Sequence, residues 1–251
     1  MTIPVYSAGE LRQAVHFTDL IEPLRVAFGE FSHGRAQQVM SALWPARRPE
    51  DGNVLIKAGC ITGHDIFVVK AAPWFKSNHV AGRPQGGIVT AFDASTGYPV
   101  AIFADEHYLS DIRTAAAGAL VADLLVPPGA TTAGVLGTGT QAYWQARALA
   151  HVRPLRRLQI WGRHRDRAAD LAERLGHADL IAVDSRTAAA GNGSVGRALQ
   201  TGALAETDLT EVGEIGAYQR EAGAITIACL VGLGIQDVVA AETALAIMQQ
   251  A

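Results

Sequence analysis

The sequence has 251 residues, of which 49% are hydrophobic and 18% are charged, so it is long enough for one large domain or two small ones and too apolar for a disordered chain. Its 21 basic and 24 acidic residues nearly balance, which leaves no overall positive field for nucleic acid or an anionic membrane. Two cysteines are too few for a disulfide framework, and neither a membrane-spanning run nor a signal-peptide pattern is present. We expect a compact cytoplasmic protein.

The first half of the sequence predicts helices followed by an antiparallel sheet. Ser7 and Glu10 have the spacing of a capping box, and apolar residues at helical spacing continue to Gly34. Four short β-type runs then alternate with turn sequences, at residues 54–56, 66–69, 87–92 and 99–103. Helical spacing from Leu109 to Leu124 predicts a long helix, which ends at the Pro-Pro-Gly sequence that follows.

The second half alternates strands and helices. Strands are expected at 132–136, 158–161 and 180–183, with helices near 140–149 and 165–175 between them. This alternation is typical of a parallel sheet with crossover helices. A strand at 225–229 and an apolar helix complete the pattern, and we expect that helix to pack back on the first domain because its apolar face would otherwise be exposed.

A glycine-rich turn follows the first strand of the parallel unit. It reads Gly-Thr-Gly-Thr-Gln-Ala from Gly137 to Ala142, a Gly-Xaa-Gly-Xaa-Xaa-Ala pattern at the head of a helix. The first glycine permits a tight turn, the second lets the backbone approach a pyrophosphate, and the alanine permits close packing of helix on strand. The alternative is a glycine-rich connection without a ligand. We predict dinucleotide binding by Gly137, Thr138, Gly139, Thr140 and Gln141.

The end of the second strand should distinguish the two nicotinamide cofactors. An acidic residue there would bind the ribose 2′-hydroxyl, whereas arginine would accept a 2′-phosphate. The sequence after Trp161 is Gly-Arg-His-Arg and contains no carboxylate. Arg163, with Arg165 as a possible second partner, therefore favours NADP(H) over NAD(H), although arginines in loops are also ordinary solvated residues.

Three basic residues lie in apolar or small-residue surroundings. Lys70 follows a β-type run and Lys57 occupies a similar place, so both ammonium groups are expected at the ends of buried strands. Arg113 precedes three alanines on the long helix. A guanidinium beside an ammonium suits the binding of a carboxylate, whereas each cation taken singly could simply extend to solvent or pair with an acid. The histidines have neither the mutual spacing nor the cysteine partners of a metal site, so no metal is expected.

Several segments together resemble the ornithine cyclodeaminase and mu-crystallin family. They are residues 67–70, 87–101, 111–117 and 231–237, with the glycine-rich turn. The resemblance implies an α+β substrate and dimerisation domain formed by residues 1–125 and 225–251, with an inserted Rossmann-type domain at 126–224. It also implies a homodimer and an NAD(P)-dependent reaction on a small amino or imino acid: cyclising deamination, ketimine reduction or reversible amination of a keto acid.

Residue by residue, the resemblance assigns the family's substrate lysine to Lys70, which is the candidate catalytic residue, and its carboxylate-binding arginine to Arg113. Thr114 matches a threonine that faces the cofactor phosphates. An earlier family arginine has no clear counterpart, since residues 37–40 read Gln-Gln-Val-Met. Lys57, a candidate substrate-binding residue, stands near a position where many members have methionine, so the substrate is left open.

Only one half of a complete dinucleotide-binding fold is visible in the sequence. After Gly176 the sequence passes directly to His177 and to a stretch that resembles the last Rossmann strand, so the family's catalytic aspartate has no counterpart, and Asp184 matches a different family aspartate. Either the molecule lacks this segment, or the printed sequence joins residues that flank an omitted stretch. We favour omission, because deleting internal strands would expose sheet edges; an intact mass of 26.4 kDa would refute it.

Two functions follow. The first is an NAD(P)-dependent enzyme that deaminates or reduces a small amino or imino acid by hydride transfer at the α-carbon. The second is a non-catalytic NADP(H)-binding protein similar to mu-crystallin, in which the missing segment has removed the activity.

Overall fold

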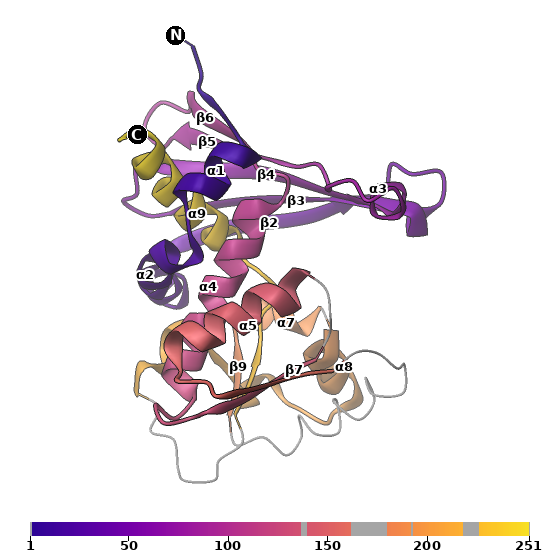
Figure 1. The fold of residues 1–251 in the computed structure, drawn as a ribbon, viewed down its shortest axis with the longest axis vertical. Coiled ribbons are helices and arrows are strands. Elements are labelled where there is room, and N and C mark those ends of the chain that lie inside the picture. The colour runs from indigo at the N-terminus through magenta and orange to yellow at the C-terminus, as the bar shows by residue number, and fades with distance from the viewer. Residues whose placement is uncertain (1, 137–139, 162–179, 192, 218–225, 251) are drawn as a thin grey trace. The chain divides into compact units, whose positions relative to one another are not determined.

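The computed structural model describes residues 2–136, 140–161, 180–191, 193–217 and 226–250. They fall into two units, one formed by Met1–Ala116 with Leu233–Ala251 and the other by Ala117–Gly232 (Figure 1). The division falls inside the long helix α4 (Tyr108–Leu125), so this helix contributes to both units.

The first unit is built on a six-stranded sheet in the order β1-β6-β5-β4-β3-β2. The pairs from β2 to β6 are antiparallel, which confirms the predicted antiparallel sheet, and β1 joins β6 in parallel. Its strands are β1 (Val5–Ser7), β2 (Ala36–Leu43), β3 (Gly52–Ile61), β4 (Ile66–Phe75), β5 (Ile88–Asp93) and β6 (Pro99–Ala104). Its helices are α1 (Ala8–Ala14), α2 (Ile21–Ser32), α3 (Lys76–Val80) and α9 (Gly234–Met248).

Helix α1 begins as predicted. The Ser7 backbone N–H and hydroxyl donate to the Glu10 carboxylate, and Glu10 N–H donates back to Ser7 Oγ, which is the reciprocal pattern of a capping box. These bonds satisfy N–H groups that have no partner within the helix.

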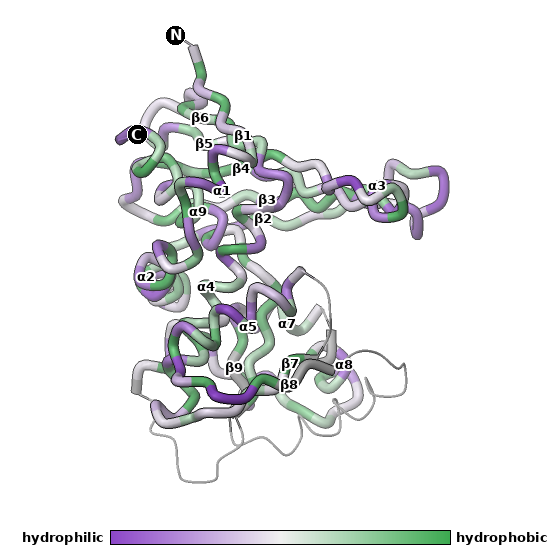
Figure 2. The backbone as a smooth tube through the Cα atoms, in the orientation of Figure 1, coloured by the Kyte–Doolittle hydropathy of each residue, from purple (hydrophilic) through white to green (hydrophobic). Residues whose placement is uncertain are grey.

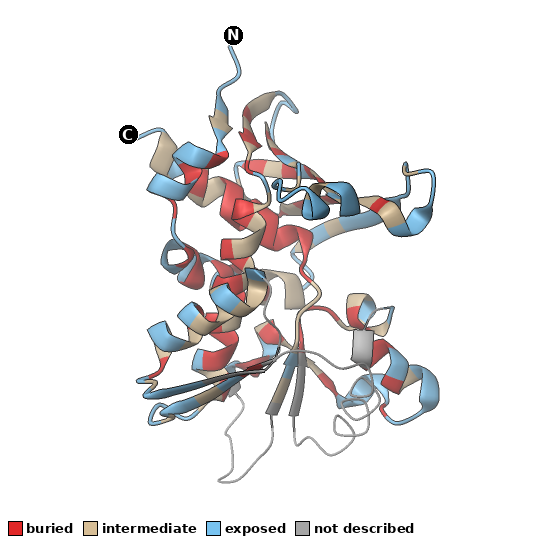
Figure 3. Ribbon diagram, turned by 45° about the vertical axis from the view of Figure 1, so that its right-hand side comes forward, coloured by how far each residue is buried: buried red, intermediate tan, exposed pale blue. Residues whose placement is uncertain are grey.

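Helix α9 packs against the inner face of this sheet, as predicted for the final helix. Its first half is almost wholly buried (Figure 3), and apolar residues dominate its length (Figure 2). The helix approaches β3 very closely: a Cβ on Gly59 would lie 2.7 Å from the Gly234 carbonyl carbon, and one on Gly234 would lie 2.5 Å from the Ala58 oxygen. Glycine at both positions therefore fixes the first turn of α9 directly over the sheet.

The second unit contains parallel strands, as the alternating pattern predicts. Strand β7 (Thr132–Leu136) pairs with β8 (Arg157–Trp161), and β9 (Leu180–Val183) lies between β10 (Leu209–Glu211) and β11 (Thr226–Cys229). Its helices are α5 (Thr140–Val152), α7 (Arg186–Ala190) and α8 (Gly193–Thr201). Among the described residues these strands form two separate sheets. The junction at 176/177 and the helix expected at 165–175 lie outside the described residues.

Candidate active site

Lys70 does not lie at the end of a strand, which corrects the sequence-based expectation for both lysines. Strand β4 continues to Phe75 and β3 to Ile61, so Lys70 and Lys57 lie within strands and face each other in the β3–β4 register. Pro73 lies within this strand, although proline has no backbone N–H to donate. It is tolerated because β4 pairs with β5 only as far as Ala71, so that beyond this point β4 pairs with β3 alone.

The two lysines and Arg113 are buried within the first unit. Their exposed fractions are 6% for Lys57, 3% for Lys70 and 5% for Arg113. Charged groups are rarely buried to this degree unless they are paired. Their partners therefore decide what the site can do.

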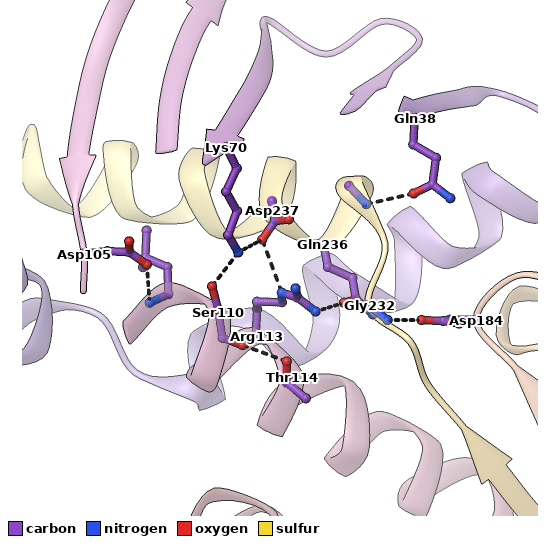
Figure 4. Close-up of polar contacts among 12 residues, drawn as sticks. Gln38, Lys70, Asp105, Ser110, Arg113, Thr114, Asp184, Gly232, Gln236 and Asp237 are labelled. Atoms are coloured by element: carbon purple, nitrogen blue, oxygen red, sulfur yellow. Dashed lines mark hydrogen bonds and ion pairs between the residues drawn. The ribbon is translucent and has the colours of Figure 1, made fainter. Parts of the chain in front are cut away.

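The side chain of Asp237, on the first turn of α9, accepts hydrogen bonds from two of these cations (Figure 4). The same oxygen, Oδ1, lies 2.8 Å from Lys70 Nζ and 3.3 Å from Arg113 Nε. Lys70 also donates to Ser110 Oγ, and Arg113 Nη1 donates to Gln236 Oε1. We call Lys70, Ser110, Arg113, Gln236 and Asp237 the buried charge cluster.

The electrostatics of this cluster keep Asp237 ionised. Burial alone would raise the pKa of its carboxyl, but the neighbouring charges of Lys70 and Arg113, with a smaller effect from Lys57, hold that pKa below its ordinary value. The second carboxylate oxygen, Oδ2, is also buried and accepts no hydrogen bond from the described residues. The cluster thus combines two directly paired cations with one anion.

The turn that leads into α4 has unusual backbone geometry. Glu106 and His107 both have positive φ, 47° and 68°, which is uncommon for residues other than glycine. Just before them, buried Asp105 accepts a hydrogen bond from Leu109 N–H at 3.0 Å. Burial raises the pKa of Asp105, although the charge of Lys70 opposes this. This strained turn starts the helix that carries Ser110 and Arg113.

Thr114 and Asp184 form hydrogen bonds within their own units. The hydroxyl of half-buried Thr114 donates to the Ser110 carbonyl at 2.7 Å. Asp184 Oδ1 accepts from Ser185 N–H, and Oδ2 accepts from Gly232 N–H at 2.7 Å, so this carboxylate fastens the end of β9 to the segment before α9 (Figure 4). These backbone bonds give Asp184 a structural role.

The predicted phosphate-binding turn is described only in part. Strand β7 ends at Leu136 and α5 begins at Thr140, and β8 follows as a parallel neighbour, so the strand–turn–helix arrangement is present. Thr140 is exposed and Gln141 is half-buried. Gly137, Thr138, Gly139 and Arg163 lie outside the described residues. Within the described residues no group of three or more potential ligand side chains could hold a metal ion.

Sequence reasoning did not identify Ser110, Gln236 or Asp237 as site residues. Gln236 and Asp237 were noted only within a segment that resembles the family. A physical signal was available, because two adjacent polar residues stand in the otherwise apolar first half of this helix, and buried polar groups need partners. Lys70 and Asp237 are 167 residues apart in the sequence, so no local pattern indicates that they pair.

The fold and this site define a two-unit α/β protein with a Rossmann-type unit joined to an α+β unit that carries a buried charge cluster. The chain belongs to the ornithine cyclodeaminase/mu-crystallin family, whose model matches residues 4–195. It is 35% identical over 176 residues to an uncharacterized cyclodeaminase of Sinorhizobium fredii, an alignment that covers 69% of this chain and 53% of the relative. The chain spans about half the length of the curated relatives it matches.

Solved structures with low sequence identity share the fold. The Δ1-pyrroline-2-carboxylate reductase of Thermococcus litoralis, solved with NADH and L-proline, has a TM-score of 0.85 at 19% identity, covering 99% of this chain and 98% of that one. An archaeal alanine dehydrogenase dimer with bound NAD also has a TM-score of 0.85 at 19% identity, covering 100% and 97%. No helix among the described residues of this chain has the length and apolar content to span a membrane.

Proposed function

We propose that this chain belongs to an NAD(P)-dependent enzyme that acts on a small amino or imino acid, either by cyclising deamination or by reduction of an imine. One observation carries the proposal. Lys70 and Arg113, both buried, share a single carboxylate oxygen, so their two positive charges are opposed by one directly bound negative charge. A ligand carboxylate would supply the missing negative charge.

The substrate carboxylate is proposed to bind between Arg113 and Lys70. The guanidinium is planar and offers several N–H donors, while the ammonium adds a point charge beside it. Lys57 is proposed to bind the substrate as well, because it faces Lys70 across the β3–β4 pair and its positive charge helps to lower the pKa of Asp237. Burial strengthens these attractions because little water competes with the ligand. Lys70 is the candidate catalytic residue.

The cofactor is proposed to bind at the junction of β7 and α5. The described ends of this motif fit a dinucleotide, because the first N–H groups of a helix have no partners within it and favour a phosphate. Thr140 and Gln141 would hold the pyrophosphate with Gly137, Thr138 and Gly139, and Thr114 would face the phosphates. Arg163 favours NADP(H) over NAD(H). When bound, the nicotinamide would accept or supply the hydride.

The test combines cofactor binding with turnover. Dissociation constants for NADPH and NADH are expected to favour NADPH, and a clear preference for NADH would contradict the role of Arg163. Net consumption of NADPH with Δ1-pyrroline-2-carboxylate would identify a reductase. Ammonia release from ornithine without net consumption would identify a cyclodeaminase. If neither substrate binds or reacts and no other small amino or imino acid does, the proposed activity is wrong.

A non-catalytic NADP(H)-binding protein is the second candidate. It is favoured by two points: the family's catalytic aspartate has no counterpart in this sequence, and Asp184 is not free to replace it, since both oxygens of that carboxylate already accept backbone hydrogen bonds. Without an acid or base, proton transfer at the substrate nitrogen could lose a factor of roughly 10² to 10⁴. Tight binding of NADPH without turnover of any tested amino or imino acid would support this candidate.

A homodimer is also proposed, with the outer face of the six-stranded sheet as its contact surface. This face is apolar along neighbouring strands: Val39 and Val69 are 64% and 38% exposed, Ile88 is 45% exposed, and the rings of Phe67 and Phe92 stack at 5.0 Å. Contiguous exposed apolar surface marks interaction sites. If both copies use the same face to bind each other, the result is a closed dimer with twofold symmetry. Sedimentation equilibrium should give twice the chain mass. A monomer at micromolar concentration would contradict this proposal.

A further inference from the structure

The buried charge cluster depends on one residue to which neither the proposed function nor the sequence motifs give a role. Asp237 is 2% exposed, and it is the one carboxylate that forms an ion pair with Lys70 or Arg113 among the described residues. Lys70 comes from β4, Arg113 from α4 and Asp237 from α9, so this side chain joins three elements (Figure 4).

The geometry restrains each cation on two sides. Lys70 Nζ lies between Asp237 Oδ1 and Ser110 Oγ, and the Arg113 guanidinium lies between Asp237 Oδ1 and Gln236 Oε1. Gln236 and Asp237 are adjacent on the first turn of α9, which the close approach of Gly234 to β3 fixes in place. Both donors are therefore held by a rigid part of the fold before any ligand arrives.

We propose that Asp237 is a positioning residue, which holds Lys70 and Arg113 side by side so that they can bind one ligand carboxylate together. This inference rests on the proposed function. Two cations in a site of low polarity repel each other, and an anion bound to both offsets the repulsion while leaving other N–H groups of the guanidinium for the ligand. Because the ionised form of Asp237 is favoured, it acts as an anion and hydrogen-bond acceptor and not as a proton donor.

The substitution Asp237→Asn tests the negative charge alone, because asparagine has nearly the same size and shape as aspartate but is neutral. Since Oδ2 accepts no hydrogen bond from the described residues, asparagine can keep an acceptor at the Oδ1 position and place its amide nitrogen where no described bond is broken. The matched control is Gln236→Leu, on the same turn and equally buried, which removes a neutral acceptor from Arg113 alone. The two variants therefore differ in whether the anion is lost.

The experiment measures kcat/KM and its pH dependence for reduction of Δ1-pyrroline-2-carboxylate, with isothermal titration of L-proline as a second readout. We expect Asp237→Asn to lower kcat/KM about 10²-fold, the size of effect seen when reacting groups are misplaced by about 1 Å. The acidic limb of the pH profile should also change, because the wild type loses this anion as the pH falls through the lowered pKa of Asp237, whereas asparagine has no carboxyl to protonate. Gln236→Leu should cost about 10-fold or less and leave the pH profile in place.

If Asp237→Asn fails to fold, the double variant Lys57→Met/Asp237→Asn removes one cation together with the anion and restores the charge balance. Compared with Lys57→Met alone, it should still show the loss of kcat/KM and the weaker binding of L-proline. Wild-type kcat/KM and pH profile in Asp237→Asn, or in the double variant relative to Lys57→Met, would overturn the inference while leaving the proposed function intact. If the wild-type protein neither binds L-proline nor reduces the imine, the proposed function fails for these ligands, and the inference fails with it.

Discussion

Replacement of Arg113 by methionine is expected to lower kcat/KM for the amino or imino acid substrate by roughly 10² to 10³-fold, chiefly through weaker substrate binding. Methionine keeps much of the side-chain length but cannot donate to a carboxylate. The loss is large because Arg113 is buried, so the ligand carboxylate would be left without a partner where water cannot replace it. Steady-state kinetics and titration with L-proline measure the effect.

Two further variants test whether the loss of kcat/KM comes from the missing guanidinium of Arg113. Arg113→Lys keeps the charge but loses the planar fork of donors, so its kcat/KM should fall between those of the wild type and Arg113→Met. Arg48→Met removes an exposed arginine that pairs with Asp51 in the same unit, and it should leave kcat/KM unchanged. If Arg113→Met were as active as Arg48→Met, the carboxylate site would have to lie elsewhere.

The second large effect is expected on stability, at Arg153. This side chain, 6% exposed, donates to the carbonyls of Ala122, Asp123, Val126 and Val152 and pairs with the Asp123 carboxylate at 3.1 Å. The last carbonyls of a helix have no partners within it, so one guanidinium satisfies the carboxyl end of α4 and binds it to the end of α5. Arg153→Met would remove the guanidinium donor from the partly buried carbonyls of Asp123, Val126 and Val152, whereas the Ala122 carbonyl would keep the Val126 N–H as a donor.

We expect Arg153→Met to lower the free energy of unfolding by about 2–4 kcal/mol, since each partly buried carbonyl left without a donor costs about 1–3 kcal/mol and water regains part of that loss. Urea titration followed by circular dichroism measures it. Arg156→Met is the matched control, because Arg156 is exposed and lies three residues along the chain, and its effect should stay within about 0.5 kcal/mol. A loss below 1 kcal/mol for Arg153→Met would show that water replaces the guanidinium at these carbonyls.

Much of the fold could be predicted because its signals are local. The capping box at Ser7, the alternation that gives β3 to β6 and the strand–helix–strand pattern around α5 each depend on neighbouring residues, and the structure confirms them. Strand ends were less predictable. The β-type run at 66–69 placed Lys70 at the end of its strand, but β4 continues through Pro73, because whether proline is tolerated depends on which neighbouring strand is present at that point.

The candidate site could be predicted only through its cations. Lys57, Lys70 and Arg113 stand out because charge is unusual in apolar surroundings, and the structure places all three in the interior of the first unit. Their partners Gln236 and Asp237 come from the other end of the sequence, and Arg153 gives no motif at all. Contacts of this kind depend on which elements the fold brings together, and no local pattern encodes them.

The position of α9 in the sequence has a consequence for synthesis on the ribosome. The sheet of the first unit and the residues that pair with Asp237 emerge well before Gly234–Met248, and the whole second unit is made in between. Until α9 arrives, the inner face of the sheet lacks its cover, and the ammonium of Lys70 and the guanidinium of Arg113 lack their counterion. Final closure of the first unit is therefore a late event, and the nascent chain is open to aggregation or chaperone binding during the interval.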